Sequence, residues 1–282
     1  MSMKKLKIKA VGSSMFIAEE IKGICQSLLG ETLEIECAAS GCVTSFSDNE
    51  FYVCANTQKG LLERYIPQEQ LFDMELKPTT AFFVDLAGIP ENEAVCVFNN
   101  LSPYINVLIA EFAEISPHKL NFIPVPYEEM DKVTARELLG KARYIIGVDC
   151  FMGERVLLSD EYRTALLPET KLIAGHRTAS LNSSYRLLRG IAAYYLEWGR
   201  RSISTGKESS LQEISSTLEA VIELIKAGTM KALFNQIGSY EEDGNSKELT
   251  TDRQRINLVQ QVHDQLRILS FLQEKVGMVT VQ

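Results

Sequence analysis

The chain has 282 residues, of which 45% are hydrophobic and 23% charged, which is a globular composition sufficient for one large domain or two small ones. The formal net charge of −8 and the sequence pI near 5.1 argue against direct nucleic-acid binding, which needs a basic face to neutralise phosphates. No apolar run approaches the roughly 20 residues needed to cross a bilayer, so we expect a cytoplasmic protein without membrane contact.

The first third of the chain alternates strand-like and helix-like patterns. Apolar residues with strand periodicity predict four strands, over residues 6–12, 32–39, 50–56 and 70–76. Helices are predicted after Ser13 or Ser14, after Asn56 or Thr57, and from Pro78 to Gly88, because these residues favour helix starts and ends.

The same pattern restarts near residue 94. Further strands are predicted over residues 94–100, 120–126, 142–149 and 171–175, with helices between them and a long helix over 179–201. Strands that alternate with helices imply βαβ units and parallel sheets. We therefore expect an α/β protein with two Rossmann-like lobes of the periplasmic-binding-protein type, over residues 1–90 and 91–202.

The last eighty residues lack strand-like runs until the final few positions. Apolar residues at 211, 214, 218, 221 and 225 form a coiled-coil-like seam, and Leu258, Val262, Leu266, Leu269 and Val276 form a second one. Two such helices bury little surface alone, so they need either dimerisation or docking on the α/β body. We expect residues 203–282 to form a helical hairpin that mediates a homodimer and carries the output.

Polar side chains follow most of the predicted strands. In parallel α/β folds ligands bind beyond the carboxyl ends of the strands, where helix N-termini also favour anions. The same residue types serve as plain helix caps, so the pattern leaves both roles open. The predicted ligand-binding residues are Ser13, Ser14, Asn56, Thr57, Thr79, Asn99, Asn100, His176 and Arg177.

The sequence lacks the common catalytic and cofactor motifs. It contains no phosphate loop, no G-x-G-x-x-G after a strand, no G-x-S-x-G elbow and no H-E-x-x-H. Its six cysteines form no C-x-x-C pair and its three histidines are far apart, so we expect buried free thiols, no metal site and no cofactor.

Two other functions stay open. One is an enzyme that uses Cys54, Asp149 or His176, and VCANT around Cys54 is similar to the Cys-Asn-Thr core of cofactor-independent amino-acid racemases, with Ala55 inserted. The other is a phosphotransfer protein, because His263 and Asp264 resemble the His-Asp pair on the phosphoacceptor helix of histidine kinases. The absent motifs favour a binding protein over an enzyme.

The element order through residues 6–200 resembles the sensory domain of the propionate-catabolism activator family of bacterial transcription regulators. The resemblance rests on FYVCANTQKGLL, QLFDMELKPTTAFFVDLA, AVCVFNN and KLIAGHRTASLNSSYRLLRGIAAYY. Where the family has an Arg-Gly-Gly turn this chain has Ala55-Asn56-Thr57, and the family's ATPase and helix-turn-helix domains have no counterpart in these 282 residues.

The resemblance implies two Rossmann-like lobes around a small-molecule effector, which is an organic acid in the family's namesake. Together with the helical tail, it leads us to expect a signal-transduction protein involved in transcription regulation. In this hypothesis the effector binds between the lobes, and the helix over 179–201 passes the signal to the tail.

Overall fold

The computed structural model describes residues 6–115, 119–204, 211–237, 266–271 and 273–274. The chain forms two compact units. Unit 1 contains the residues up to Leu76 and those from Ala179 onward, and unit 2 contains Lys77–Thr178. The two crossing segments, β5 (Leu76–Pro78) and β10 (Arg177–Ala179), pair as a two-stranded sheet.

This division differs from the expected boundaries at residues 90 and 202. The helix α3 (Thr80–Ala87), expected in the first lobe, packs in unit 2, where Phe82 and Leu86 share a core with Val95. The long helix α8 (Leu181–Ser204), expected in the second lobe, packs in unit 1. The apolar periodicity of a helix shows which face is buried but not which sheet covers it.

Unit 1 contains a parallel four-stranded sheet in the order β2-β1-β3-β4. Its strands are β1 (Lys7–Gly12), β2 (Glu34–Ala39), β3 (Glu50–Ala55) and β4 (Leu71–Met74). Its helices are α1 (Met15–Leu29), α2 (Asn56–Leu62), α8 and α9 (Leu211–Ile237), with short 3₁₀ turns η1 (Ser40–Cys42) and η2 (Gln68–Gln70).

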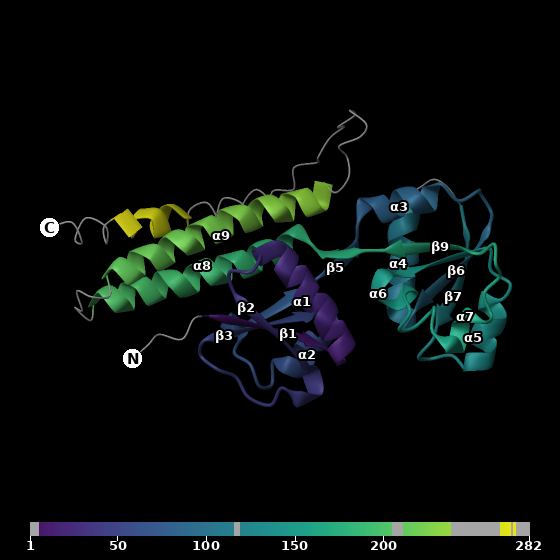
Figure 1. Ribbon diagram of the computed structural model, residues 1–282, viewed down its shortest axis with the longest axis horizontal. Helices are drawn as coiled ribbons and strands as arrows, with labels where there is room; N and C mark the ends of the chain where they lie inside the picture. Colours follow the sequence, from purple (N-terminus) through teal and green to yellow (C-terminus); the bar gives the residue numbers. More distant parts are fainter. Residues whose placement is uncertain (1–5, 116–118, 205–210, 238–265, 272, 275–282) are drawn as a thin grey trace. The chain divides into compact units, whose positions relative to one another are not determined.

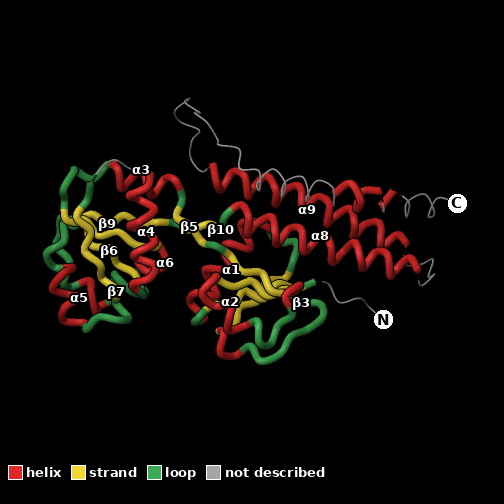
Figure 2. The backbone as a smooth tube through the Cα atoms, turned by 180° about the vertical axis from the view of Figure 1, so that it is seen from behind, coloured by secondary structure: helices red, strands yellow, loops and turns green. Residues whose placement is uncertain are grey.

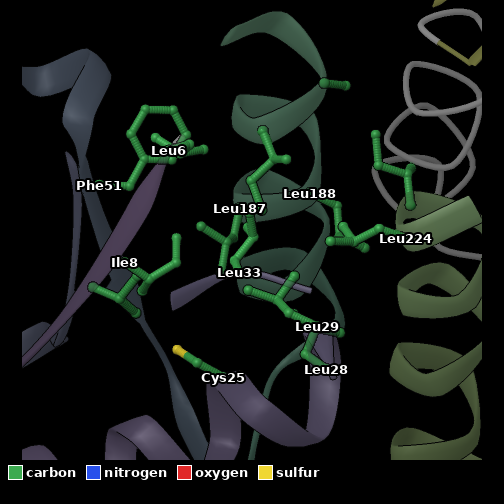
Figure 3. Close-up of a cluster of buried hydrophobic side chains, with 14 of the residues drawn as sticks. Leu6, Ile8, Cys25, Leu28, Leu29, Leu33, Phe51, Leu187, Leu188 and Leu224 are labelled. Atoms are coloured by element: carbon green, nitrogen blue, oxygen red, sulfur yellow. The ribbon is translucent and has the colours of Figure 1, made fainter. Parts of the chain in front are cut away.

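Both faces of this sheet are covered, as parallel sheets require. Ile8 of β1 and the preceding Leu6 pack with α1 and α8, whereas Val11, Tyr52 and Cys54 belong to a separate core on the other face. Figure 3 shows part of the larger core: Leu6 and Ile8 lie on one side of α8, and Leu188 of α8 lies beside Leu224 of α9 on the other.

The tail helix α9 lies along α8 and also contacts α1, all within unit 1 (Figures 1 and 2). Gly228 permits this close approach, because a Cβ there would lie 2.7 Å from Leu188 Cδ2 and 3.3 Å from the Leu28 carbonyl oxygen. Leu269, in the helical segment 266–271, is buried in the same core.

The first tail helix is therefore docked on the α/β body. The fully or almost fully buried side chains of α9 are Ile214, Leu218, Val221, Ile222, Leu224, Ile225 and Ala232. The sequence left two ways to bury the first seam, dimerisation or docking on the α/β body, and α9 is docked. Dimerisation through a coiled coil stays a prediction, and most of the second predicted tail helix lies outside the described residues.

Unit 2 repeats the strand order of unit 1 as a parallel sheet β7-β6-β8-β9. Its strands are β6 (Ala94–Asn99), β7 (Asn121–Pro126), β8 (Tyr144–Val148) and β9 (Lys171–Gly175). Besides α3, its helices are α4 (Ser102–Ile115), α5 (Lys132–Leu139), α6 (Asp149–Met152) and α7 (Asp160–Arg163).

The predicted α/β class with two Rossmann-like lobes and parallel sheets is confirmed. In each sheet the first strand lies between the second and the third. The chain therefore adds the second strand on one side of the first and the later strands on the other side. This change of side creates a topological switch point, where α/β proteins bind ligands, between β1 and β3 and between β6 and β8. Among the described helices, none is long and apolar enough to cross a membrane.

Candidate functional site

The carboxyl ends of β6, β8 and β9 bring polar residues together in unit 2. Asn99 ends β6, Asp149 follows β8 directly, and His176 follows β9 directly. These are adjacent parallel strands, with Phe98 paired to Gly147 and Val148 paired to Gly175. We call this place, formed by Asn99, Asn100, Asp149 and His176, the β6/β8 edge.

Asn99 presents a buried donor at this edge. Its side chain is 1% exposed, and its Oδ1 accepts a hydrogen bond of 2.7 Å from the backbone N–H of Asn100. The amide nitrogen Nδ2 is buried and has no hydrogen-bond partner among the described residues. Such a group costs about 1–3 kcal/mol when left unpaired, and nearly all buried polar groups have a partner, so Nδ2 is a candidate ligand contact.

Asp149 and His176 form a hydrogen-bonded pair. Asp149 Oδ2 lies 2.8 Å from His176 Nδ1, and Asp149 Oδ1 accepts from the Cys150 backbone N–H at 2.7 Å. An ionised carboxylate only accepts hydrogen bonds, so it favours the imidazole tautomer with the proton on Nδ1. The neutral ring then presents Nε2 as an acceptor, and two-thirds of the His176 side chain is exposed.

Two other predicted residues adjoin this edge with different roles. The Thr79 backbone N–H donates to the His176 carbonyl at 3.0 Å, which places the start of α3 beside the edge. Arg177 is buried, and its guanidinium lies 4.9 Å from the ring centroid of Tyr104 in α4. This is the geometry of a cation–π contact, so Arg177 packs against Tyr104 within unit 2.

The N-terminus of α4 already holds a carboxylate of the chain itself. Ser102 donates both its backbone N–H, at 3.1 Å, and its hydroxyl to Glu129 Oε2. A carboxylate there is stabilised by the unpaired N–H groups and the dipole of the helix. A ligand at the β6/β8 edge would therefore contact Asn99 and His176 first, rather than the first turn of α4.

The corresponding edge of unit 1 is exposed and less specialised. Ser13 and Ser14 follow β1, while Asn56 and Thr57 open α2 after β3. The Ser14 hydroxyl accepts from the Ile17 backbone N–H at 3.4 Å, so Ser14 acts as the cap of α1. For this residue the geometry matches the plain-cap alternative that the sequence left open.

Cys54 does not have the surroundings of a nucleophile. It is fully buried in unit 1, and burial, reinforced by Asp73, raises the pKa of its thiol to about 12. A thiol with this pKa stays protonated and unreactive near neutral pH. Of the three enzyme candidates, only Asp149 and His176 meet within hydrogen-bond reach. His263, the phosphotransfer candidate, lies outside the described residues.

The comparisons with known proteins identify no relative. No protein-family model, curated protein or solved structure was found that matches this chain. Within either unit taken by itself, the described residues include no cluster of three His, Cys, Asp or Glu ligand atoms close enough to share a metal ion.

The structure also contains a large groove that the sequence did not reveal. It has a volume of about 1430 Å³ and lies in unit 1 between α8 and the segments that precede β3 and β4. We call it the α8 groove. Its lining includes Phe46, Asp48, Glu69, Tyr194 and Trp198. The only trace of this groove in the sequence is a second face of α8, which carries aromatic and arginine residues at spacings of three and four.

Proposed function

We propose that this chain is a sensor that binds a small polar ligand at the β6/β8 edge. The observation that carries this proposal is the buried Asn99 Nδ2 without a partner, at the same switch point as the Asp149–His176 pair. The Asn99 donor and the imidazole oriented by Asp149 lie at the carboxyl ends of strands of one parallel sheet, which suits a ligand that offers an oxygen acceptor and a hydroxyl or amide donor.

The ligand site is connected to the tail through the chain itself. His176 leads into β10 and then into α8, whose start is tied to β4 in unit 1. The Ser180 N–H donates to the Glu75 carbonyl at 2.8 Å, and the Glu75 N–H donates to the Ser183 hydroxyl at 3.0 Å. A ligand that binds His176 in one conformation more tightly than in another would bias the position of this segment.

The next step of this route is the packing of α8 against α9. Leu188 of α8 fits against Gly228 of α9, so a shift of α8 requires α9 to move or repack. We infer that α9 is the element that reports ligand binding. We also propose that both lobes enclose the effector, which the presence of two parallel α/β lobes supports. A homodimer formed by the tail and a role in transcription regulation remain part of the proposal.

Thermal unfolding in the presence of small organic acids, amino acids, sugars and nucleosides tests the proposal. A ligand present at about 100 times its Kd stabilises the folded state by about 2.7 kcal/mol. We expect His176→Ala to weaken this stabilisation, whereas the exposed Asn106→Ala in α4 leaves it unchanged. If every stabilising compound acts equally on both variants, the site is elsewhere.

An enzyme is the second candidate, favoured by the 2.8 Å Asp149–His176 contact. An acid–base pair needs this geometry to transfer a proton to or from a bound substrate. NMR spectra of each stabilising compound, recorded before and after incubation, distinguish the two functions. Conversion that is lost in Asp149→Asn supports the enzyme, and an unchanged compound supports the sensor.

A further inference from the structure

The α8 groove has properties of a protein-binding surface. Its volume of about 1430 Å³ exceeds the roughly 300–1,000 Å³ of most small-molecule pockets. One wall is the helix α8, and the other is formed by residues 46–49 and 67–70, which precede β3 and β4. All of these residues belong to unit 1.

The strand-side wall is held in place by hydrogen bonds. Gln70, which is buried, donates from Nε2 to the Ser47 carbonyl at 2.9 Å and to the Glu50 carbonyl at 3.1 Å. The Lys7 N–H of β1 donates to the Asn49 carbonyl at 2.9 Å. A preformed wall lowers the ordering cost of binding, so the groove is prepared to receive a partner.

A connected series of aromatic rings lies along the groove. Ring centroids are 4.8 Å apart between Phe72 and Phe51, and 5.8 Å apart between Phe51 and Tyr194. Tyr195, which is buried and is not part of the lining, connects Tyr194 to Trp198, with ring separations of 5.2 and 6.0 Å. Phe46, on the opposite wall, is 47% exposed.

The lining charges that lack a partner are negative. Arg186 donates to Asp73 Oδ1 at 2.6 Å, Arg201 donates to Glu197 Oε1 at 2.7 Å, and Arg189 is engaged as well. Asp48 and Glu69 are exposed on the strand-side wall, and neither makes an ion pair within the part of the chain that the structure describes. The groove therefore complements a partner that carries a positive charge.

Three other kinds of partner fit less well. The lining contains three arginines and three acidic residues, so it lacks the positive charge that attracts nucleic acid. An added β-strand would need the outer backbone of β4, where Arg186 already binds the Asp73 carbonyl at 2.7 Å. An amphipathic helix needs a continuous apolar floor, whereas arginines line this groove along α8.

We propose that the α8 groove docks an extended, proline-containing peptide segment that carries lysine or arginine. Polyproline-type segments bind aromatic-lined grooves through their rings and need few backbone hydrogen bonds. Asp48 and Glu69 pair with the basic side chains, and Phe46 and Trp198 contact the proline rings. The inference concerns unit 1 alone and does not depend on the ligand proposed for unit 2.

Trp198 makes a direct assay possible, because it is the only tryptophan in the chain and it lines the groove. The probe is a peptide of consecutive prolines with an arginine at each end, titrated against the full chain while tryptophan emission is recorded. We expect a saturable change in emission. The same peptide with glutamate in place of each arginine should bind about fivefold more weakly or worse, because two attractive pairs become repulsive.

Matched variants locate the binding site. Asp48→Asn combined with Glu69→Gln should weaken the arginine peptide about fivefold, whereas Glu31→Gln, an exposed acid outside the lining, should not. Phe46→Ala should weaken binding by a similar factor. Leu61→Ala removes a similarly exposed apolar side chain, 40% exposed, from α2 and should have no effect.

Each other outcome overturns the proposal. An unchanged emission on addition of the arginine peptide means that the groove does not accept this class of partner. Equal binding of the glutamate peptide removes the role of Asp48 and Glu69. Tighter binding of a single-stranded thymidine oligonucleotide would assign the aromatic rings to nucleic acid instead, and binding that survives all groove variants would place the peptide elsewhere.

Discussion

Leu218→Ala measures whether α9 belongs to the body of unit 1. Leu218 is 0% exposed and lies in the core shared by α1, α8 and β1. Removing a buried leucine side chain costs about 2–5 kcal/mol, from lost transfer free energy and from the cavity left behind. Because the burial is intramolecular, the free energy of unfolding should fall by this amount at every protein concentration.

Urea unfolding followed by circular dichroism, repeated over a wide range of protein concentrations, provides the assay. Met230→Ala in the same helix is the control, because Met230 is 51% exposed and should change stability by no more than about 0.5 kcal/mol. A similarly small effect of Leu218→Ala would refute the docking of α9. A midpoint that rises with protein concentration would report the proposed homodimer, not the loss of this docking.

Three further predictions concern unit 1. Gly12→Ala should destabilise the fold by about 1–3 kcal/mol or more, because the new Cβ would lie 2.3 Å from a backbone nitrogen in the first turn of α1. Burial opposes ionisation of Asp73, but the Arg186 hydrogen bond prevails and lowers the pKa of its carboxyl. The stabilising effect of the ionised Asp73 carboxylate is therefore complete above about pH 4 and is lost as pH falls through its folded-state pKa. Asp73→Asn should therefore reduce the fall in the free energy of unfolding at acidic pH. Iodoacetamide should label the exposed Cys42 of the native protein before the buried Cys54, whose pKa is about 12, as mapped by mass spectrometry.

Each of these predictions has a control or a contradicting result. Gly23→Ala, in the same region but with open space around the new Cβ, should be neutral or stabilising by up to about 1 kcal/mol. An unchanged fall at acidic pH in Asp73→Asn would show that the Arg186 pair does not set it. Rapid labelling of Cys54 without denaturant would mean that its core opens readily.

The sequence predicted the strands well because their apolar runs are short and bounded by clear helix signals. For example, the run over 94–100 corresponds to β6, and Gly88 and Gly140 follow α3 and α5 as expected. The sequence did not predict which sheet α3 and α8 cover, because periodicity marks a buried face without identifying what it contacts.

The site residues were likewise predicted only in part from the sequence. Asn99 and His176 could be proposed from the sequence, because parallel strands bring their carboxyl ends to one edge. The missing partner of Asn99 Nδ2 depends on tertiary packing and could not be foreseen. Trp198 lines a groove whose other wall comes from residues more than a hundred positions earlier, which the periodicity of one helix cannot reveal.

Hydrogen–deuterium exchange with and without a stabilising ligand shows whether binding at the β6/β8 edge reaches α8 and α9. We expect slower exchange in two places: at the β6/β8 edge, near residues 99–102 and 149–152, and in α8 and α9, which connect to it through β10. Protection at the edge with no change in α8 or α9 would mean that the site binds but does not signal. Protection that misses the edge altogether would contradict the proposed site.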